Sequence, residues 1–153
     1  MEMHLSSPAF KYGEKMPERY SCDGADLSPP LAWAETPQGT HSFALFCDDP
    51  DAPDGTFHHW AVYDIPVSTH DLPEGVPNTD MIGLIRQGMN DFGKPGYGGA
   101  CPPKGHRAHH YHFKLMALDV GHLDVRGRNC GDIEAMARKH VLAETELMAT
   151  YSR

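Results

Sequence analysis

Two short segments far apart in the sequence combine prolines with histidines, and they are the first candidates for a functional site. Residues 48–60 read DDPDAPDGTFHHW and residues 102–113 read PPKGHRAHHYHF. Proline stiffens the backbone and histidine titrates near neutral pH, so such segments can build a rigid site whose charge responds to pH. We therefore expect the two segments to meet in space and to form a binding pocket.

The hydrogen-bond donors in these segments suit a phosphate-like anion. His59, His109 and the Tyr111 hydroxyl can donate to such an anion. Backbone N–H groups of the glycine-rich residues 93–99 can add further donors. The predicted ligand is therefore a small anion such as phosphate or phosphoethanolamine. The walls of the pocket are expected to come from Pro53, Tyr97 and Pro103.

Two carboxylates in the first segment need a role in an anion site. Asp49 or Asp51 could accept the second ring N–H of a histidine and raise the pKa of that ring. Either could also receive the ammonium group of a zwitterion such as phosphoethanolamine. The alternative is an Asp-Pro turn in which the two side chains cap their own backbone.

The 11 histidines also raise the question of a metal site. Side chains alternate along a strand, which separates His109 from His110, and the pair His110 and His112 would need a third ligand. The sequence has no HExxH or similar spacing that fixes a closed site. We expect no metal and no other cofactor. A metal-dependent hydrolase that uses the histidine cluster is the alternative.

Other catalytic chemistry finds little support in the sequence. Ser28 and Ser42 lie outside any G-x-S-x-G context. Asp49 and Asp51 are two residues apart in a proline-locked turn, a spacing that gives no sign of two carboxylates flanking a substrate. We therefore expect a binding protein rather than an enzyme, with no catalytic residues.

The charge of the chain excludes some partners. A formal net charge of −8 argues against nucleic acid and against an anionic membrane surface. Between residues 86 and 114, however, there are five basic residues and one acidic residue. A local positive field of this kind suits a small anion, although the alternative is a chance run of solvated charges.

Length and composition indicate one globular domain over residues 1–153. Hydrophobic residues make up 40% of the chain and charged residues 22%, and no apolar run approaches the roughly 20 residues that a membrane helix needs. The first ten residues lack a basic start followed by an apolar core, which predicts no signal peptide. The expected location is the cytoplasm, with no integral membrane contact.

The four cysteines form no recognisable disulfide framework. Cys22, Cys47, Cys101 and Cys130 are widely spaced without a CxxC pair, and a cytoplasmic chain would keep them reduced. Cys47, within an apolar strand, is expected in the core. Cys101, in a glycine-rich loop beside a proline, is the one thiol to test for reactivity.

Turn residues divide the chain into short segments that are typical of a mainly β protein. The chain has 15 glycines and 13 prolines, turn signals recur about every ten residues, and most segments between these turns are rich in β-branched and aromatic residues. One helix is expected near the C-terminus: Asp132 is its predicted N-cap, and apolar residues follow it at helical spacing (Ile133, Met136, Ala137, Val141, Leu147 and Met148). Strands are predicted over residues 27–33, 41–48, 58–65, 83–89 and 109–118.

Alternation along residues 109–118 assigns side chains to the two faces of that strand. His109 and Tyr111 share one face and can enter one site, while His110 and His112 face outward.

The same rule applied to residues 58–65 separates the two histidines there. It puts His59 on one face with Ala61 and Tyr63, and His58 on the other with Trp60. Only one histidine of this pair can therefore face the pocket.

At this level of detail the sequence resembles the phosphatidylethanolamine-binding protein family, in particular its bacterial Raf kinase inhibitor-like branch. The resemblance runs through most of the chain and rests on several blocks in a fixed order. They are LSP at 27–29, LAW at 31–33, DPDAP at 49–53, HW at 59–60, DFG at 91–93, GYGG at 96–99 and PP at 102–103, followed by His109 and Tyr111.

The resemblance implies a β-sandwich of two antiparallel sheets with a few peripheral helices, and a small cavity for phosphate-like anions. Matching the motifs places the pocket residues at Asp49, Asp51, Pro53, His59, Pro103, His109 and Tyr111. The resemblance also implies that relatives inhibit kinases or proteases by binding them, and it makes a homodimer plausible.

One position departs from the family pattern. The family usually has His-Arg-Tyr where this chain has His109-His110-Tyr111. The missing arginine puts the support of the neighbouring loop and the anion affinity in question, and Arg107 in the preceding turn is a candidate substitute.

Overall fold

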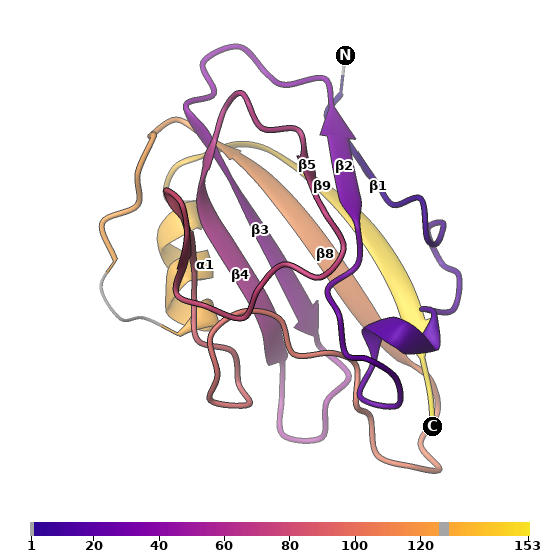
Figure 1. The fold of residues 1–153 in the computed structure, drawn as a ribbon. Coiled ribbons are helices and arrows are strands. Elements are labelled where there is room, and N and C mark those ends of the chain that lie inside the picture. The colour runs from indigo at the N-terminus through magenta and orange to yellow at the C-terminus, as the bar shows by residue number, and fades with distance from the viewer. Residues whose placement is uncertain (1, 126–128) are drawn as a thin grey trace.

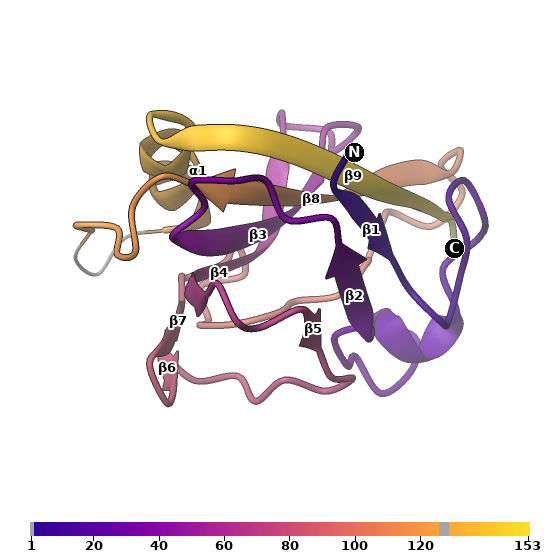
Figure 2. The same ribbon diagram turned by 90° about the horizontal axis from the view of Figure 1, so that it is seen from above.

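Two antiparallel sheets form the protein, and the computed structural model describes residues 2–125 and 129–153 of it. The larger sheet has the strand order β6-β7-β4-β3-β8-β9 and the smaller one the order β1-β2-β5 (Figures 1 and 2). The larger sheet consists of β3 (Ser42–Asp49), β4 (Phe57–Pro66), β6 (Met81–Ile82), β7 (Ile85–Gln87), β8 (His109–Leu118) and β9 (Val141–Tyr151). The smaller one consists of β1 (His4–Ser6), β2 (Leu31–Ala34) and β5 (Asp71–Leu72).

Each face of the larger sheet is covered by a different layer. On one face, Leu5 and Trp33 of the smaller sheet pack with Phe43, Val62 and Phe113 of the larger one to form the main core. On the other face, the helix α1 (Cys130–Arg138) covers β3 and β4 (Figure 1). Its residues Ile133 and Ala137 pack there in a second cluster with Phe46, Ala61 and Met116. The central strands are therefore buried on both faces, which explains why their sequences are apolar throughout.

This architecture confirms the predicted mainly β fold of two antiparallel sheets. The strand predicted over residues 109–118 matches β8, and those predicted over 41–48 and 58–65 match β3 and β4 to within one residue at each end. A short 3₁₀ helix at Glu18–Tyr20 is the other helical element among the described residues. Neither helix in this part of the chain has the length or the apolar character that is needed to cross a bilayer.

The C-terminal segment differs from the prediction. The helix α1 ends at Arg138, and its N-cap is Asn129, whose side chain accepts a hydrogen bond from the backbone N–H of Asp132. Residues 141–151 form the strand β9 beside β8, although Val141, Leu147 and Met148 were expected to belong to the helix. In this strand Leu147, Ala149 and Tyr151 are buried, so the apolar residues here follow the two-residue period of a strand.

A β-bulge in β4 changes the facing of the two adjacent histidines. Cys47 pairs with Trp60 and Asp48 pairs with His58, so His59 is an extra residue with no partner on β3. His59 and Trp60 therefore lie on the same side of the sheet, and His58 shares the opposite side with Ala61. The expected grouping of His59 with Ala61 was wrong because simple alternation does not hold across a bulge.

The expectation that all four cysteines stay reduced was also wrong. Cys22 and Cys101 form a disulfide, with their Cα atoms 5.4 Å apart. The backbone brings them together, because the N–H of Cys22 donates to the carbonyl of Ala100 over 3.0 Å. Cys47 and Cys130 are free and buried, and Cys47 lies in the main core as expected.

Candidate ligand-binding site

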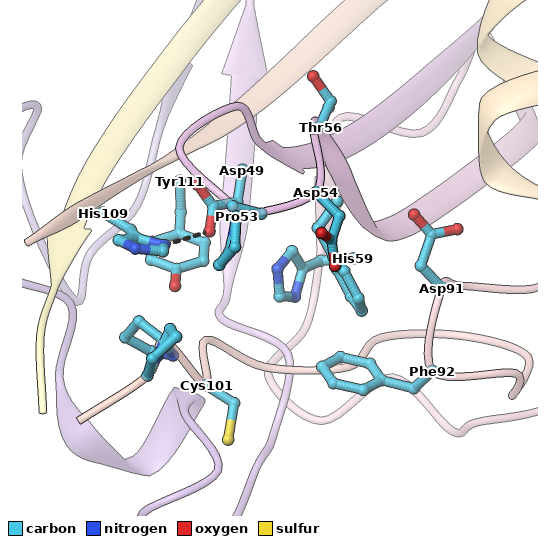
Figure 3. Close-up of a pocket in the computed structure, with 15 residues that line it drawn as sticks. Asp49, Pro53, Asp54, Thr56, His59, Asp91, Phe92, Cys101, His109 and Tyr111 are labelled. Atoms are coloured by element: carbon cyan, nitrogen blue, oxygen red, sulfur yellow. Dashed lines mark hydrogen bonds and ion pairs between the residues drawn. The ribbon is translucent and has the colours of Figure 1, made fainter. Parts of the chain in front are cut away.

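A cavity of about 400 Å³ opens where three strand ends meet, namely the end of β3 and the starts of β4 and β8. The two proline-rich segments of the sequence do meet here, as Figure 3 shows. The lining residues are Asp49, Ala52, Pro53, Asp54, Gly55, Thr56, Phe57, His59, Asp91, Phe92, Cys101, Pro102, Pro103, His109 and Tyr111.

The most buried polar pair of the cavity is Asp49 and His109. Asp49 lies at the end of β3 and His109 at the start of the neighbouring β8. The His109 Nδ1 atom is 2.7 Å from Asp49 Oδ2, and each residue is only 3% exposed. A carboxylate oxygen accepts, so Nδ1 carries the proton and Nε2 is left for a ligand. The expected orientation of a histidine by Asp49 is present in the structure.

Asp49 also caps the backbone of the turn after β3, which was the alternative role considered for this residue. Its Oδ1 atom accepts a hydrogen bond of 2.8 Å from the backbone N–H of Asp51, while Oδ2 accepts from His109. The same carboxylate therefore fixes the loop after β3 and the histidine of β8. Both hydrogen-bonding arrangements considered for this residue are therefore present at once.

His59 enters the cavity from the bulge in β4, and its ring is oriented by a backbone carbonyl. Its Nδ1 atom lies 2.7 Å from the oxygen of Gly98. A carbonyl oxygen only accepts, so Nδ1 carries a proton and Nε2 of the neutral ring is a hydrogen-bond acceptor. Burial lowers the pKa of His59, which favours this neutral form. The donor role expected for His59 therefore changes to that of an acceptor.

Tyr111 supplies a hydroxyl beside the two histidines. Its ring stacks on His109 and meets the His59 ring edge-on. Figure 3 shows the hydroxyl directed toward the loop that carries Cys101. Burial, followed by the negative charge of Asp49, raises the pKa of Tyr111 far above its usual value. The hydroxyl stays protonated and can donate to a ligand.

Pro53 and Pro103 line the cavity, as expected, but Asp51 and Arg107 do not. Asp51 accepts hydrogen bonds of 2.8 Å from both the backbone N–H and Nδ1 of His110, on the rim of the site. His110 thus supports the loop after β3, where the family usually has an arginine. Arg107 is exposed and lies outside the lining.

Tyr97 and the glycine-rich loop around it lie behind the cavity. The Tyr97 hydroxyl donates to the backbone oxygen of Tyr20 over 2.6 Å, so this residue does not form a cavity wall. The expected backbone donors of this loop already have acceptors within the protein. They are the N–H groups of Gly93, Gly96, Gly98 and Gly99, bonded to Asn90, Gly88, His59 and Asp26 respectively.

Two aromatic residues that were not among the expected site residues, Phe57 and Phe92, form the outer part of the cavity. Phe57 lies at the start of β4, and Phe92 follows the bend at Asp91. Asp91 is fixed to β4 because its Oδ2 atom accepts from the His58 backbone N–H over 2.7 Å. The rings of Phe57 and Phe92 have centroids 4.7 Å apart, and both contact His59. The DFG block at 91–93 was the available signal for Phe92.

The charge of the cavity is the reverse of what the basic segment 86–114 suggested. None of the described residues that line the cavity is Lys or Arg. Three aspartates, Asp49, Asp54 and Asp91, do line it. Lys114 faces the other side of the sheet, where it pairs with Asp48 and Glu134. The positive field predicted from the sequence therefore does not converge on the cavity.

A potential group of metal ligands lies on the helix side of the sheet. Asp48, His58 and Glu134 offer ligand atoms that are all within 4.8 Å of one another. The Lys114 ammonium already contacts both carboxylates, and Asp48 accepts from His58 Nδ1 over 2.9 Å. These residues fit an ion-pair cluster that anchors α1 to the sheet, and they are not part of the cavity.

Comparison with known proteins gives a consistent result over the whole length. Residues 6–152 match the family described as phosphatidylethanolamine-binding protein. A UPF0098 protein of Aquifex aeolicus is 47% identical over 152 residues, which cover 99% of this chain and 89% of the relative.

Solved structures support the same relationship. The crystal structure of Escherichia coli YbcL, described as a new member of the mammalian PEBP family, matches with a TM-score of 0.93 at 36% identity and covers 100% of this chain and 99% of YbcL. A homologue from Chlamydia trachomatis matches with a TM-score of 0.87 at 37% identity and covers 99% of this chain and 98% of its own.

Proposed function

Since the chain belongs to the phosphatidylethanolamine-binding protein family, we propose that it is a binding protein without catalytic activity whose cavity takes a small anion. The proposed ligand is phosphate or a phosphorylated headgroup such as phosphoethanolamine. The observation that carries this proposal is the His109 ring, which Asp49 holds by Nδ1 so that Nε2 remains for a ligand. When Nε2 is also protonated, the ring is a cation that donates to an anion, and the Asp49 carboxylate compensates its charge.

The outer part of the cavity suits the ammonium group of such a headgroup. Asp54 and Asp91 are exposed carboxylates at this end, and Phe57 and Phe92 present aromatic rings beside them. Carboxylates and aromatic faces both attract an organic cation. A zwitterion with phosphate near His109 and ammonium near Asp54 or Asp91 would satisfy both ends.

The absence of an activated nucleophile among the described cavity residues supports binding over catalysis. The raised pKa of Tyr111 makes its phenolate scarce, and the Cys101 sulfur is held in the disulfide. The alternative is a metal-dependent hydrolase that uses the histidine cluster. Among the described residues, however, the potential metal ligands that come together are Asp48, His58 and Glu134, which lie outside the cavity.

An NMR titration tests the proposal. Phosphoethanolamine and inorganic phosphate are added to the wild type, to His109→Ala and to His112→Ala, whose histidine pairs with Glu146 on the outer face. Saturable shifts around residues 49–59 and 101–111 are expected in the wild type and in His112→Ala, but not in His109→Ala. Absence of saturable shifts in the wild type at millimolar ligand would refute the anion site.

Partner and location are separate parts of the proposal. The proposed macromolecular target is a protein kinase or a protease, which a pull-down with defined targets tests. The proposed assembly is a homodimer, which light scattering tests. The cytoplasm is the location proposed from the sequence, and the Cys22–Cys101 disulfide weighs against it, because structural disulfides persist mainly in oxidising compartments. The disulfide makes that location testable, because a reducing cytoplasm would leave Cys22 and Cys101 open to alkylation when cells are lysed into a thiol reagent.

A further inference from the structure

We propose that the cavity selects phosphate monoesters in their singly protonated form over phosphate diesters. This inference rests on the proposed function, since it names the class of anion that the same site takes. A singly protonated monoester presents one P–OH donor together with unprotonated oxygens that accept. A diester of the same charge presents acceptors only.

The ring nitrogen of His59 that faces the cavity needs a ligand group that donates a hydrogen bond. His59 Nδ1 donates to the Gly98 carbonyl 2.7 Å away, because a carbonyl oxygen has no proton to give, and Nε2 of the neutral ring is therefore an acceptor. Nε2 of the same ring has no partner among the described residues, and the ring lines the cavity (Figure 3). A bound P–OH group would donate to Nε2, whereas a diester oxygen would meet it with a second lone pair.

The other side of the cavity supplies hydrogen-bond donors. The Tyr111 hydroxyl is protonated, and His109 Nε2 donates when its ring is charged. Together with His59 Nε2, the site therefore offers one acceptor beside two donors. This arrangement complements the oxygens of a singly protonated phosphate.

The fixed charges around the cavity favour a ligand with one negative charge over a ligand with two. Asp49, Asp54 and Asp91 line the cavity, and within the described lining no Lys or Arg offsets them. A phosphate with two negative charges would meet these carboxylates without a fixed compensating cation. The same surroundings tolerate a phosphate with one negative charge, in particular one whose proton is shared with His59.

The test compares two isomers. Ethyl phosphate and dimethyl phosphate contain the same atoms, and at about pH 5, below the second phosphate pKa of about 6, both carry one negative charge. Isothermal titration of the wild type should show ethyl phosphate binding about tenfold or more tightly, the effect expected for an acceptor left unpaired in a buried site. Equal affinities, or tighter binding of dimethyl phosphate, would overturn the inference while the proposed function stands. If neither isomer nor inorganic phosphate binds, the proposed function itself fails.

A pair of variants assigns the selection to His59. The amide of His59→Gln can turn its NH₂ group toward a diester, so the affinity ratio between the isomers should fall toward one. His58→Gln alters the neighbouring residue on the opposite face of the sheet and should leave the ratio unchanged. An unchanged ratio in folded His59→Gln would overturn the role given to His59. Because His59 is buried, the NMR spectrum of the variant is used to check that it folds. If it does not fold, the affinities of the wild type for ethyl phosphate and dimethyl phosphate decide the inference.

Discussion

His58 and His59 are neighbours in the sequence, yet they lie on opposite faces of the larger sheet. His58 bonds to Asp48 beneath the helix α1, and His59 lines the cavity beside Tyr111. The bulge at His59 produces this division, because it adds one residue to β4 between two successive pairs with β3. The two histidines therefore serve separate clusters and respond to different substitutions.

Asp49→Asn should weaken both the fold and the ligand site. Asp49 is buried and accepts hydrogen bonds from the backbone of Asp51 and from His109 Nδ1. The amide cannot compensate a charged His109 ring, and its NH₂ group would face one of these two donors. We expect a loss of about 1–3 kcal/mol in the free energy of unfolding, measured in urea, and at least tenfold weaker phosphate binding. Unchanged phosphate affinity in a folded variant would contradict the role given to the pair.

His58 should make stability depend on pH. The hydrogen bond to Asp48 raises the pKa of His58 above that of an unfolded histidine, about 6.5. The stabilisation is then fully present below that unfolded value and is lost as the pH rises through the raised folded value. The difference in free energy of unfolding between the wild type and His58→Gln should be larger at about pH 5.5 than at about pH 8.5. A difference that grows with pH would contradict the assignment.

Breaking the disulfide should destabilise the protein and disturb one cavity wall. Replacing Cys22 and Cys101 together by serine removes a cross-link between residues 79 apart, with an expected cost of about 2–4 kcal/mol in urea unfolding. Anion affinity should also fall, since Cys101 and the two prolines after it line the cavity. Alkylation of the denatured wild type without reductant should label two thiols, those of Cys47 and Cys130. Labelling of four would show that the bond does not form.

Gly98→Ala should displace an aromatic wall of the cavity. A Cβ atom at Gly98 would overlap the ring of Phe92, and the Gly98 carbonyl orients His59. We expect about 1–3 kcal/mol of destabilisation from this overpacking, together with weaker anion binding. Gly121→Ala is the control, because the nearest atom to its added Cβ would be 3.9 Å away. Equal behaviour of the two variants in unfolding and in titration would show that Phe92 moves aside freely.

Much of the sheet could be predicted because local patterns and the final packing agree. The strand β8 alternates over residues 109–115, with His109, Tyr111 and Phe113 buried, and its bounds were predicted correctly. The strand β9 was missed because Val141, Leu147 and Met148 also fit a helical spacing. The pairing of β9 with β8 decides the structure of residues 141–151. Most of the paired residues are far apart in the sequence, so local patterns do not report this pairing.

The site was predictable in residue type but not in detail. Asp49, His59, His109 and Tyr111 stand out by chemistry and by motif, and the structure brings them together at one cavity. The acceptor role of His59 depends on the Gly98 carbonyl, which lies 39 residues along the chain. No local pattern reports which backbone oxygen will face a given ring. For the same reason the pairing of Cys22 with Cys101 left no local signal.

The disulfide also divides the cavity between two topological parts of the molecule. Asp49 and His59 lie within the chain segment that Cys22 and Cys101 close into a ring, whereas His109 and Tyr111 lie in the tail beyond it. A protease that cuts once in the exposed loop between β3 and β4 would open the ring without releasing a fragment. The nicked protein would migrate as an intact chain in a denaturing gel until reductant separates its two pieces.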